Sequence, residues 1–257
     1  MDHEQRILDI PGLLNVRDLG GLPVEGGGQT QFGGVIRGSD ADKLEQPGVS
    51  ALIDQVGISR EIDLRDEMSG AAGPGSLLAQ QVEERHQLSV YEDSDAKLTI
   101  DRLMIEWEWD QSEEYITALT TPAGITSILA LLSDESEHTT YVHCNVGKDR
   151  TGLISALILS AVGVEREAVI EDYALSALDT DEWLQRMYAA QDKLGEITRR
   201  ANPNSVRSFM SARSENMAKT LDYIDTNFGI AADYVRGLPN GDEILEGLRR
   251  KLVEAWE

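Results

Sequence analysis

The most constraining feature of this sequence is a short apolar segment followed, after a brief loop, by a helix pattern that is apolar on nearly every side. Residues 139–143 are typical of a short buried strand. The helix pattern after the loop has apolar residues on all its faces: Leu153, Ile154, Ala156, Leu157, Ile158, Leu159 and Ala161. A helix of this kind is buried on most sides and lies at the centre of a fold.

A second pattern predicts the sheet to which the buried strand belongs. Residues 34–37 and 59–65 are predicted strands, and residues 47–56 between them carry apolar side chains at helical spacing. A strand–helix–strand unit indicates a parallel sheet with covering helices. A further strand is expected at 87–91, and the Thr121–Pro122 pair predicts a helix start, as a cap and a first-turn proline.

Everything from residue 165 onward is predicted to be helical. The expected helices span 165–178, 180–200, 205–227 and 242–255. No linker divides the chain, so residues 1–257 are expected to form a single domain, in which the mainly helical residues 165–257 form a cap or lid. The predicted fold class is α/β, with a central, mostly parallel sheet flanked by helices and a helical C-terminal cap.

Composition excludes several classes of protein. The 257 residues include 46 acidic and 23 basic side chains, a net charge of −23 that argues against binding to nucleic acid or to anionic lipid. Cys144 is the only cysteine, so neither an intrachain disulfide nor a multi-cysteine metal cluster is possible. No apolar run reaches the ~18 residues of a membrane helix, so no integral membrane association is expected. The acidic N-terminus lacks the features of a secretory signal, so a cytoplasmic location is expected, with export without a classical signal left open. The oligomeric state is not determined by these patterns.

The chemistry is concentrated between the buried strand and the buried helix, in residues 143–152. Backbone amides and a helix N-terminus converge on such a loop and form an anion site. Cys144 stands at the strand end, where the same amides and the helix dipole favour its thiolate. Arg150 can hold two oxygens of a phosphate, and Gly147 lets the backbone approach the anion closely. The Thr151 hydroxyl can stabilise the sulfur as a leaving group.

These residue types suit attack of a thiolate on a phosphate ester, with a phosphocysteine that water then hydrolyses. Arginine and backbone amides neutralise the phosphoryl charge, so no metal and no other cofactor is expected. A nucleotide-binding Walker loop fails on spacing, because Asp149 and Val142 stand where Ser or Thr and a glycine are needed. A cysteine protease needs a histidine facing the thiol, and the adjacent His143 points the other way along a strand.

The run from His143 to Gly152 resembles the signature loop of the protein tyrosine phosphatase superfamily, Cys-x5-Arg followed by Thr or Ser. Its Gly-Lys-Asp-Arg-Thr-Gly form is similar to a bacterial tyrosine-phosphatase-like family that includes a secreted mycobacterial enzyme. Residues 15–21 (Asn-Val-Arg-Asp-Leu-Gly-Gly), 37–39 (Arg-Gly-Ser) and 63–65 (Asp-Leu-Arg) resemble further motifs of that family, the second with an added glycine.

The resemblance implies roles for individual residues. Cys144 would be the nucleophile, Arg150 the phosphate clamp and Asp149 the general acid. Substrate contacts or support of the loop are expected from the following residues: Asn145, Val146, Gly147, Lys148, Thr151, Asp63 and His143. Lys148 would add positive charge suited to highly charged phosphates such as phosphoinositides, the alternative being a solvated loop tip.

Two other carboxylates compete for the role of general acid. Asp63, at a strand end, is the second candidate and would otherwise orient the loop or Arg150. Asp110 follows Trp109 and resembles the mobile Trp-Pro-Asp loop of large tyrosine phosphatases, although the proline is missing. Trp107 and Trp109 are otherwise expected to anchor an acidic segment.

The predicted function is that of a cysteine-dependent phosphatase acting on phosphotyrosine in proteins, with phosphoserine and phosphothreonine as further substrates. The alternative enzymatic function is hydrolysis of phosphoinositides or small phosphate esters. The alternative outside them is an inactive phosphopeptide-binding module, against which the intact Cys144, Arg150 and Thr151 argue.

Overall fold

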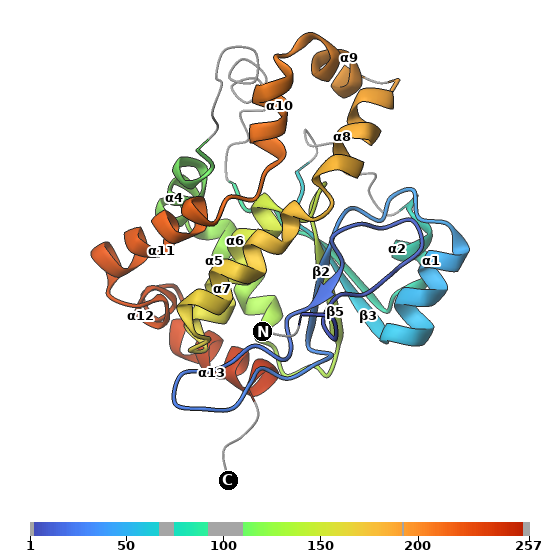
Figure 1. Cartoon of the computed structure of the whole chain (residues 1–257). Helices are drawn as coiled ribbons and strands as arrows, with labels where there is room; N and C mark the ends of the chain where they lie inside the picture. Colours follow the sequence, from blue (N-terminus) through green and yellow to red (C-terminus); the bar gives the residue numbers. More distant parts are fainter. Residues whose placement is uncertain (1–2, 67–74, 92–109, 192, 254–257) are drawn as a thin grey trace.

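The computed structural model describes residues 3–66, 75–91, 110–191 and 193–253 (Figure 1). One sheet has the strand order β1-β2-β5-β3-β4. The strands are β1 (Arg17–Asp18), β2 (Val35–Gly38), β3 (Ile58–Asp63), β4 (Glu84–Gln87) and β5 (Thr139–His143). β1 is antiparallel to β2, whereas all other neighbours are parallel. The predicted central, mostly parallel sheet is therefore confirmed.

Helices cover both faces of this sheet (Figure 1). One face carries α1 (Gln46–Ser50), which continues into the π-helical turn η1 (Ala51–Val56), and α2 (Leu77–Gln81). The other face carries α4 (Ser112–Thr120), α5 (Ala123–Leu132), α6 (Asp149–Ala161), α7 (Arg166–Ala174), α11 (Ser214–Phe228), α12 (Ala231–Arg236) and α13 (Gly241–Leu252). The 3-10 turn η4 (Leu175–Ala177) follows α7.

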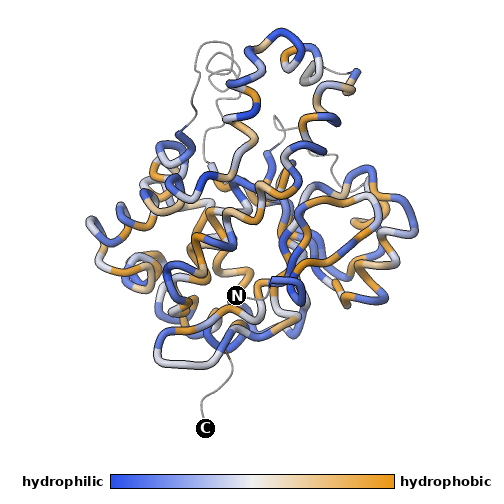
Figure 2. Tube along the Cα trace, viewed as in Figure 1, coloured by the Kyte–Doolittle hydropathy of each residue, from blue (hydrophilic) through white to orange (hydrophobic). Residues whose placement is uncertain are grey.

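Alternation along the strands explains why both faces are covered. Neighbouring residues of a strand point to opposite faces, and Val35 and Val142 belong to the core cluster beneath the larger group of helices. Ile36 follows Val35 in β2, and Tyr141 precedes Val142 in β5. Both belong to the cluster beneath α1 and α2. Figure 2 shows hydrophobic segments gathered in the interior between the sheet and the helices.

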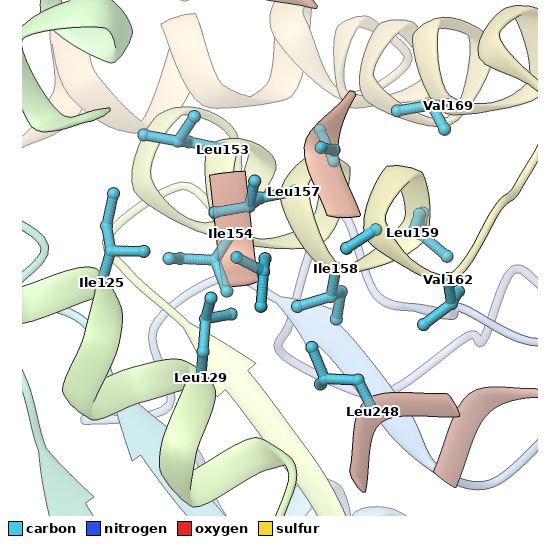
Figure 3. Close-up of a cluster of buried hydrophobic side chains, with 14 of the residues drawn as sticks. Ile125, Leu129, Leu153, Ile154, Leu157, Ile158, Leu159, Val162, Val169 and Leu248 are labelled. Carbon is cyan, nitrogen blue, oxygen red and sulfur yellow. The ribbon is translucent and has the colours of Figure 1, made fainter. Parts of the chain in front are cut away.

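Helix α6 is the buried central helix that the sequence predicts. Leu153, Ile154, Leu157 and Ile158 are all at most 1% exposed. They lie among Ile125 and Leu129 of α5 and Leu248 of α13 (Figure 3). Because α6 packs on so many sides, the loop at its start is held in place by the core of the protein.

The cap is smaller than the sequence predicts. Of the helices in the described part of the chain, only α8 (Thr180–Ala189), α9 (Lys193–Arg200) and α10 (Pro203–Met210) stand beyond the ends of the strands (Figure 1). These three helices, called the cap below, have a hydrophobic cluster of their own. Helices α7 and α11–α13, from the same predicted region, contribute to the main core instead.

The helix predicted at 180–200 is divided into α8 and α9, and the helix predicted at 205–227 is divided into α10 and α11. Two further local predictions are wrong. The strand expected at 87–91 lies at Glu84–Gln87, because pairing with β3 sets its position, with Gln87 opposite Asp63. Thr121 does not cap α5, since Pro122 occupies that position and the Thr121 hydroxyl donates to the Thr117 carbonyl of α4.

Among the described residues, no single helix is long and apolar enough to cross a membrane, although α4 and α5, bent by 85°, pass that test jointly by length and composition.

Candidate active site

The segment between β5 and α6, residues 144–148 (the cysteine loop), makes a tight turn against β2. Gly147 has a φ of +73°, in the left-handed region that favours glycine. A Cβ atom there would lie 2.3 Å from the Gly38 carbonyl oxygen, so no side chain fits. The Gly147 carbonyl accepts a 2.7 Å hydrogen bond from Arg37 Nη2. Glycine at this position is thus required both by conformation and by close approach to β2.

Cys144 is buried at the start of this loop, immediately after β5, and is a free thiol. Burial raises the pKa of the thiol, but the positive charge of Arg150 and hydrogen bonding from the hydroxyl and amide of Thr151 outweigh it. The pKa of Cys144 is therefore below its ordinary value, although the charge of Asp149 opposes the shift. A thiolate stabilised in this way is the reactive form of cysteine.

Asp149 and Arg150 are the first two residues of α6, so both lie in the first turn beside the thiol. The carboxylate of Asp149 is partly exposed and accepts a 2.7 Å hydrogen bond from Tyr115 Oη. Tyr115 in turn lies 2.9 Å, hydroxyl to hydroxyl, from Tyr173 of α7. The two buried tyrosines thus fix one oxygen of Asp149, a role that sequence reasoning missed.

Asp63 supports the cysteine loop through an arginine. Its carboxylate accepts 2.8 Å hydrogen bonds from both Nε and Nη2 of Arg65. Arg65 Nη1 reaches the side-chain oxygen of Asn145 at 3.4 Å. Burial raises the pKa of Asp63, but the Arg65 hydrogen bonds and the charges of His143 and Arg65 hold it below its ordinary value. These contacts suit an ionised orienting group better than a proton donor.

His143 lies beneath Cys144 and is fully buried. Its Nδ1 atom is 3.3 Å from the Cys144 carbonyl oxygen, and its Nε2 atom is 2.9 Å from Glu61 Oε1. Burial lowers the pKa of His143, but the hydrogen bond and charge of Glu61 outweigh burial and raise it. The imidazole therefore supports the backbone at Cys144, and Glu61 is its partner.

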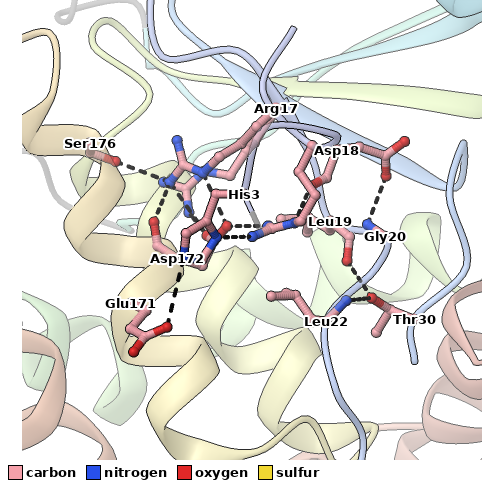
Figure 4. Close-up of polar contacts among 12 residues, drawn as sticks. His3, Arg17, Asp18, Leu19, Gly20, Leu22, Thr30, Glu171, Asp172 and Ser176 are labelled. Carbon is pink, nitrogen blue, oxygen red and sulfur yellow. Dashed lines mark hydrogen bonds and ion pairs between the residues drawn. The ribbon is translucent and has the colours of Figure 1, made fainter. Parts of the chain in front are cut away.

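Three arginines from the first forty residues pair with one buried carboxylate, that of Asp172 in α7. Figure 4 shows Arg17 beside this carboxylate. Arg6, Arg17 and Arg37 all pair with it, at 3.0 Å for Arg17 Nε and 2.7 Å for Arg37 Nη1. Burial raises the pKa of Asp172, but the three arginines hold it far below its usual range. Because Arg37 also donates to the Gly147 carbonyl, this cluster holds the cysteine loop in place from the side of β2.

Sequence reasoning found Arg17 and Arg37 only as parts of motifs and missed Asp172. No sequence pattern separates Asp172 from the other acidic residues of the helix predicted at 165–178. Asn15, the first residue of the Arg17 motif, has a φ of +60° and donates from Nδ2 to the Val146 carbonyl at 3.0 Å.

Lys148 and Val146 connect the cysteine loop with the cap. Val146 packs against the hydrophobic cluster of the cap. The side chain of Lys148 is 1% exposed, so it is not a solvated loop tip. Its ammonium donates to the backbone carbonyl of Phe209 and, at 3.3 Å, to that of Ser211.

The contacts of Asp110 are with α4 and α11. Its carboxylate accepts from the amide and hydroxyl of Ser112 and pairs with Lys219 of α11 at 2.5 Å. Burial raises the pKa of Asp110, but Lys219 and Ser112 hold it below its ordinary value. Trp107 and Trp109 lie outside the described residues. Within the part of the chain that the structure describes, no group of three or more His, Cys, Asp or Glu side chains is placed to hold a metal ion.

Comparison with known proteins gives consistent findings. The family model described as "Tyrosine phosphatase family" matches residues 8–254. The chain is 22% identical to the triple specificity protein phosphatase PtpB of Mycobacterium tuberculosis over 264 residues, covering 90% of this chain and 93% of that protein. It is 25% identical to a tyrosine-protein phosphatase of Nostoc commune over 143 residues, covering 55% of this chain and about half (48%) of the relative.

One solved structure is also similar, the core catalytic domain of the PP-IP phosphatase SIW14 from S. cerevisiae in complex with citrate. The likeness has a TM-score of 0.39 at 12% identity and covers 78% of this chain and 93% of that domain. A likeness of this size bears on neither the fold nor the function.

Proposed function

Because the chain belongs to the tyrosine phosphatase family, we propose that it hydrolyses phosphotyrosine in proteins, and phosphoserine and phosphothreonine more slowly, through a phosphocysteine. The observation that carries this proposal is the Cys144 thiol, whose pKa is lowered by Arg150 and Thr151 at the start of a buried helix. A stabilised thiolate, an arginine and loop amides are what transfer of a phosphoryl group to sulfur needs.

The first step forms a bond between sulfur and phosphorus. The Cys144 thiolate attacks the phosphorus atom, and the bond from phosphorus to the tyrosyl oxygen breaks. Asp149 gives its proton to that leaving oxygen, while Arg150 and the amides of residues 145–150 hold the other phosphoryl oxygens. Asp149 is preferred as the acid because it lies in the first turn of α6 beside the thiol, whereas Arg65 binds both oxygens of Asp63 and Asp110 pairs with Lys219 of α11.

The second step releases phosphate. Water attacks the phosphocysteine, the Asp149 carboxylate takes a proton from it, and the bond between sulfur and phosphorus breaks to restore the thiolate. Thr151 stabilises the departing sulfur. No step needs a metal ion, because Arg150 and the amides neutralise the charge.

A second candidate function is hydrolysis of phosphoinositides or small phosphate esters. It is supported by the name of the mycobacterial relative, a triple specificity protein phosphatase, which indicates that the substrates of that enzyme are not confined to one class. The cytoplasm is the proposed compartment, and a phosphorylated protein is the proposed partner.

A panel assay tests both candidates. Phosphate release is measured from phosphotyrosine, phosphoserine and phosphothreonine peptides and from short-chain phosphoinositides, with and without chelator. We expect the highest kcat/KM on phosphotyrosine peptides, no effect of the chelator, and a loss of at least about 10³-fold in Cys144→Ser. Vanadate, as a phosphate analogue, should still bind the native enzyme.

Three results would count against the proposal. Loss of turnover with chelator, or native rates in Cys144→Ser, would exclude the thiolate mechanism. Binding of phosphopeptides without any release of phosphate would indicate a phosphopeptide-binding module. A higher kcat/KM on phosphoinositides than on every peptide would select the second candidate function.

A further inference from the structure

Lys148, the last residue of the cysteine loop, has its charge directed at the cap. Its ammonium donates to the carbonyls of Phe209 and Ser211, lies 3.4 Å from Asp149 Oδ1 and sits 5.1 Å from the centre of the Phe209 ring. An ammonium has three N–H donors, and three oxygen atoms surround this one. The lysine side chain is also almost fully buried.

The acceptors of Lys148 lie where the cap ends. Helix α10 ends at Met210, so the carbonyls of Phe209 and Ser211 belong to its last turn and to the chain directly after it. Carbonyl groups at the C-terminal end of a helix attract cations. The Phe209 carbonyl accepts a second hydrogen bond, of 3.0 Å, from Gln111 Nε2. The C-terminal end of α10, where the chain leaves the cap, is therefore held by one charged and one neutral donor.

On the other side, Lys148 contacts the reactive part of the molecule. It adjoins Asp149 in sequence and lies beside the carboxylate oxygen that also accepts from Tyr115. One side chain thus touches both the proposed general acid and the end of the cap.

We propose that Lys148 is a positioning residue that holds the cap against the cysteine loop. Its charge then makes no contribution to discrimination between substrates that carry different charges. The contacts of Lys148 with Phe209, Ser211 and Asp149 are called the clamp below. The clamp holds the end of α10 at the cysteine loop and keeps Asp149 in place when the cap is closed. The part of this proposal that concerns turnover rests on the proposed phosphatase function, whereas the part that concerns the cap does not.

Amide hydrogen exchange of the full chain, without substrate, tests the clamp directly. Loss of a buried charge-assisted hydrogen bond in Lys148→Met should speed exchange in α8 and α10 about tenfold or more. Exchange in α5, which lies in the main core, should stay within about twofold. Lys148→Arg, which keeps the charge and the donors, should restore most of the protection. Arg200→Met is the matched control, because it removes an exposed cation of the cap that pairs with Glu196 and should leave exchange unchanged.

Kinetics then separate positioning from recognition of charge. The values of kcat and KM are measured for a phosphotyrosine peptide with one phosphate and for a peptide with two. If Lys148 is a clamp, Lys148→Met lowers kcat/KM for both peptides by the same factor, and Lys148→Arg largely restores both.

Three outcomes overturn the proposal. They are unchanged cap exchange in Lys148→Met, equal acceleration in the cap and in α5, and a loss confined to the peptide with two phosphates. If the native enzyme releases no phosphate from any ester, the proposed function fails, while the exchange experiment still decides the clamp.

Discussion

The body of the protein and its cap are held together by different means. Around the cysteine loop, the body combines a large cluster of almost fully buried apolar side chains with buried ion pairs such as those of Asp172. The cap has a small cluster, in which Leu184 and Met187 remain 8% and 7% exposed. Of the 46 acidic and 23 basic residues in the chain, residues 180–210 hold four and five, so the body carries the whole net negative charge.

This difference matches two different requirements, a fixed geometry for the reacting groups and freedom of movement for the cap. Reacting groups must be held in a fixed geometry, and Cys144 and Arg150 stand where β5 meets the most buried helix. Elements that move are drawn from the less stable parts of a structure, with few buried apolar contacts. The cap meets that description, and the contacts of Val146 and Lys148 place it against the loop.

The largest expected effect is at Asp149, where the body meets the cap. Asp149→Asn should slow cleavage of phosphotyrosine by about 10²–10⁴ in kcat/KM, because an amide gives no proton to the leaving oxygen. The loss should shrink for an aryl phosphate with a more acidic phenol, which leaves without protonation. Steady-state kinetics on the two substrates measure the difference.

Asp110→Asn is the matched control for this prediction. Its carboxylate pairs with Lys219 at the surface, so the substitution should change kcat/KM for either substrate by less than about threefold. If Asp110→Asn showed the loss that depends on the leaving group and Asp149→Asn did not, the general acid would be misassigned.

Two leucine-to-alanine substitutions, one in the body and one in the cap, test whether the cap contributes less than the body to global stability. Leu157→Ala in α6 should lower the free energy of unfolding by about 2–5 kcal/mol, as expected for a fully buried leucine. Leu184→Ala should speed amide exchange within the cap but lower the stability of the body by less than about 0.5 kcal/mol. Urea unfolding and hydrogen exchange together measure both quantities. An equal loss of global stability in the two variants would make the cap part of the same cooperative unit.

The smallest expected effect is on the pH dependence of the thiol. Since the pKa of Cys144 is lowered, alkylation by iodoacetamide should reach half its maximal rate at a lower pH than alkylation of an unperturbed cysteine. Below that midpoint the thiol is protonated, and the rate falls about tenfold for each pH unit.

Two substitutions should move this midpoint in opposite directions. Arg150→Met removes a charge that lowers the pKa and should raise the midpoint by about one pH unit, whereas Asp149→Asn removes a charge that raises it and should lower the midpoint. Shifts of the same sign in both variants would contradict this account of the site.

Most of the sheet and of the central helix could be predicted, because each depends on a local pattern. Alternation along β3 and the apolar faces of α6 follow from which residues lie next to each other in sequence. The start of α5 was missed for a local reason, because the Thr121 hydroxyl donates to the Thr117 carbonyl instead of capping the next helix. The position of β4 could not be predicted, since it is set by pairing with β3, more than twenty residues away in the chain. Asp172 was missed for the same reason, because its meaning depends on arginines more than a hundred residues away.

The sequence by itself determined the proposed chemistry, because the proposed nucleophile, phosphate-binding arginine and general acid lie within seven consecutive residues between one strand and one helix. Tertiary structure decided which charges serve that chemistry. It paired Asp63 with Arg65, Asp110 with Lys219, and Lys148 with carbonyls at the end of the cap. The reason is physical: spacing along the chain fixes which groups share a loop, whereas the partner of a long charged side chain is fixed only when distant segments pack together.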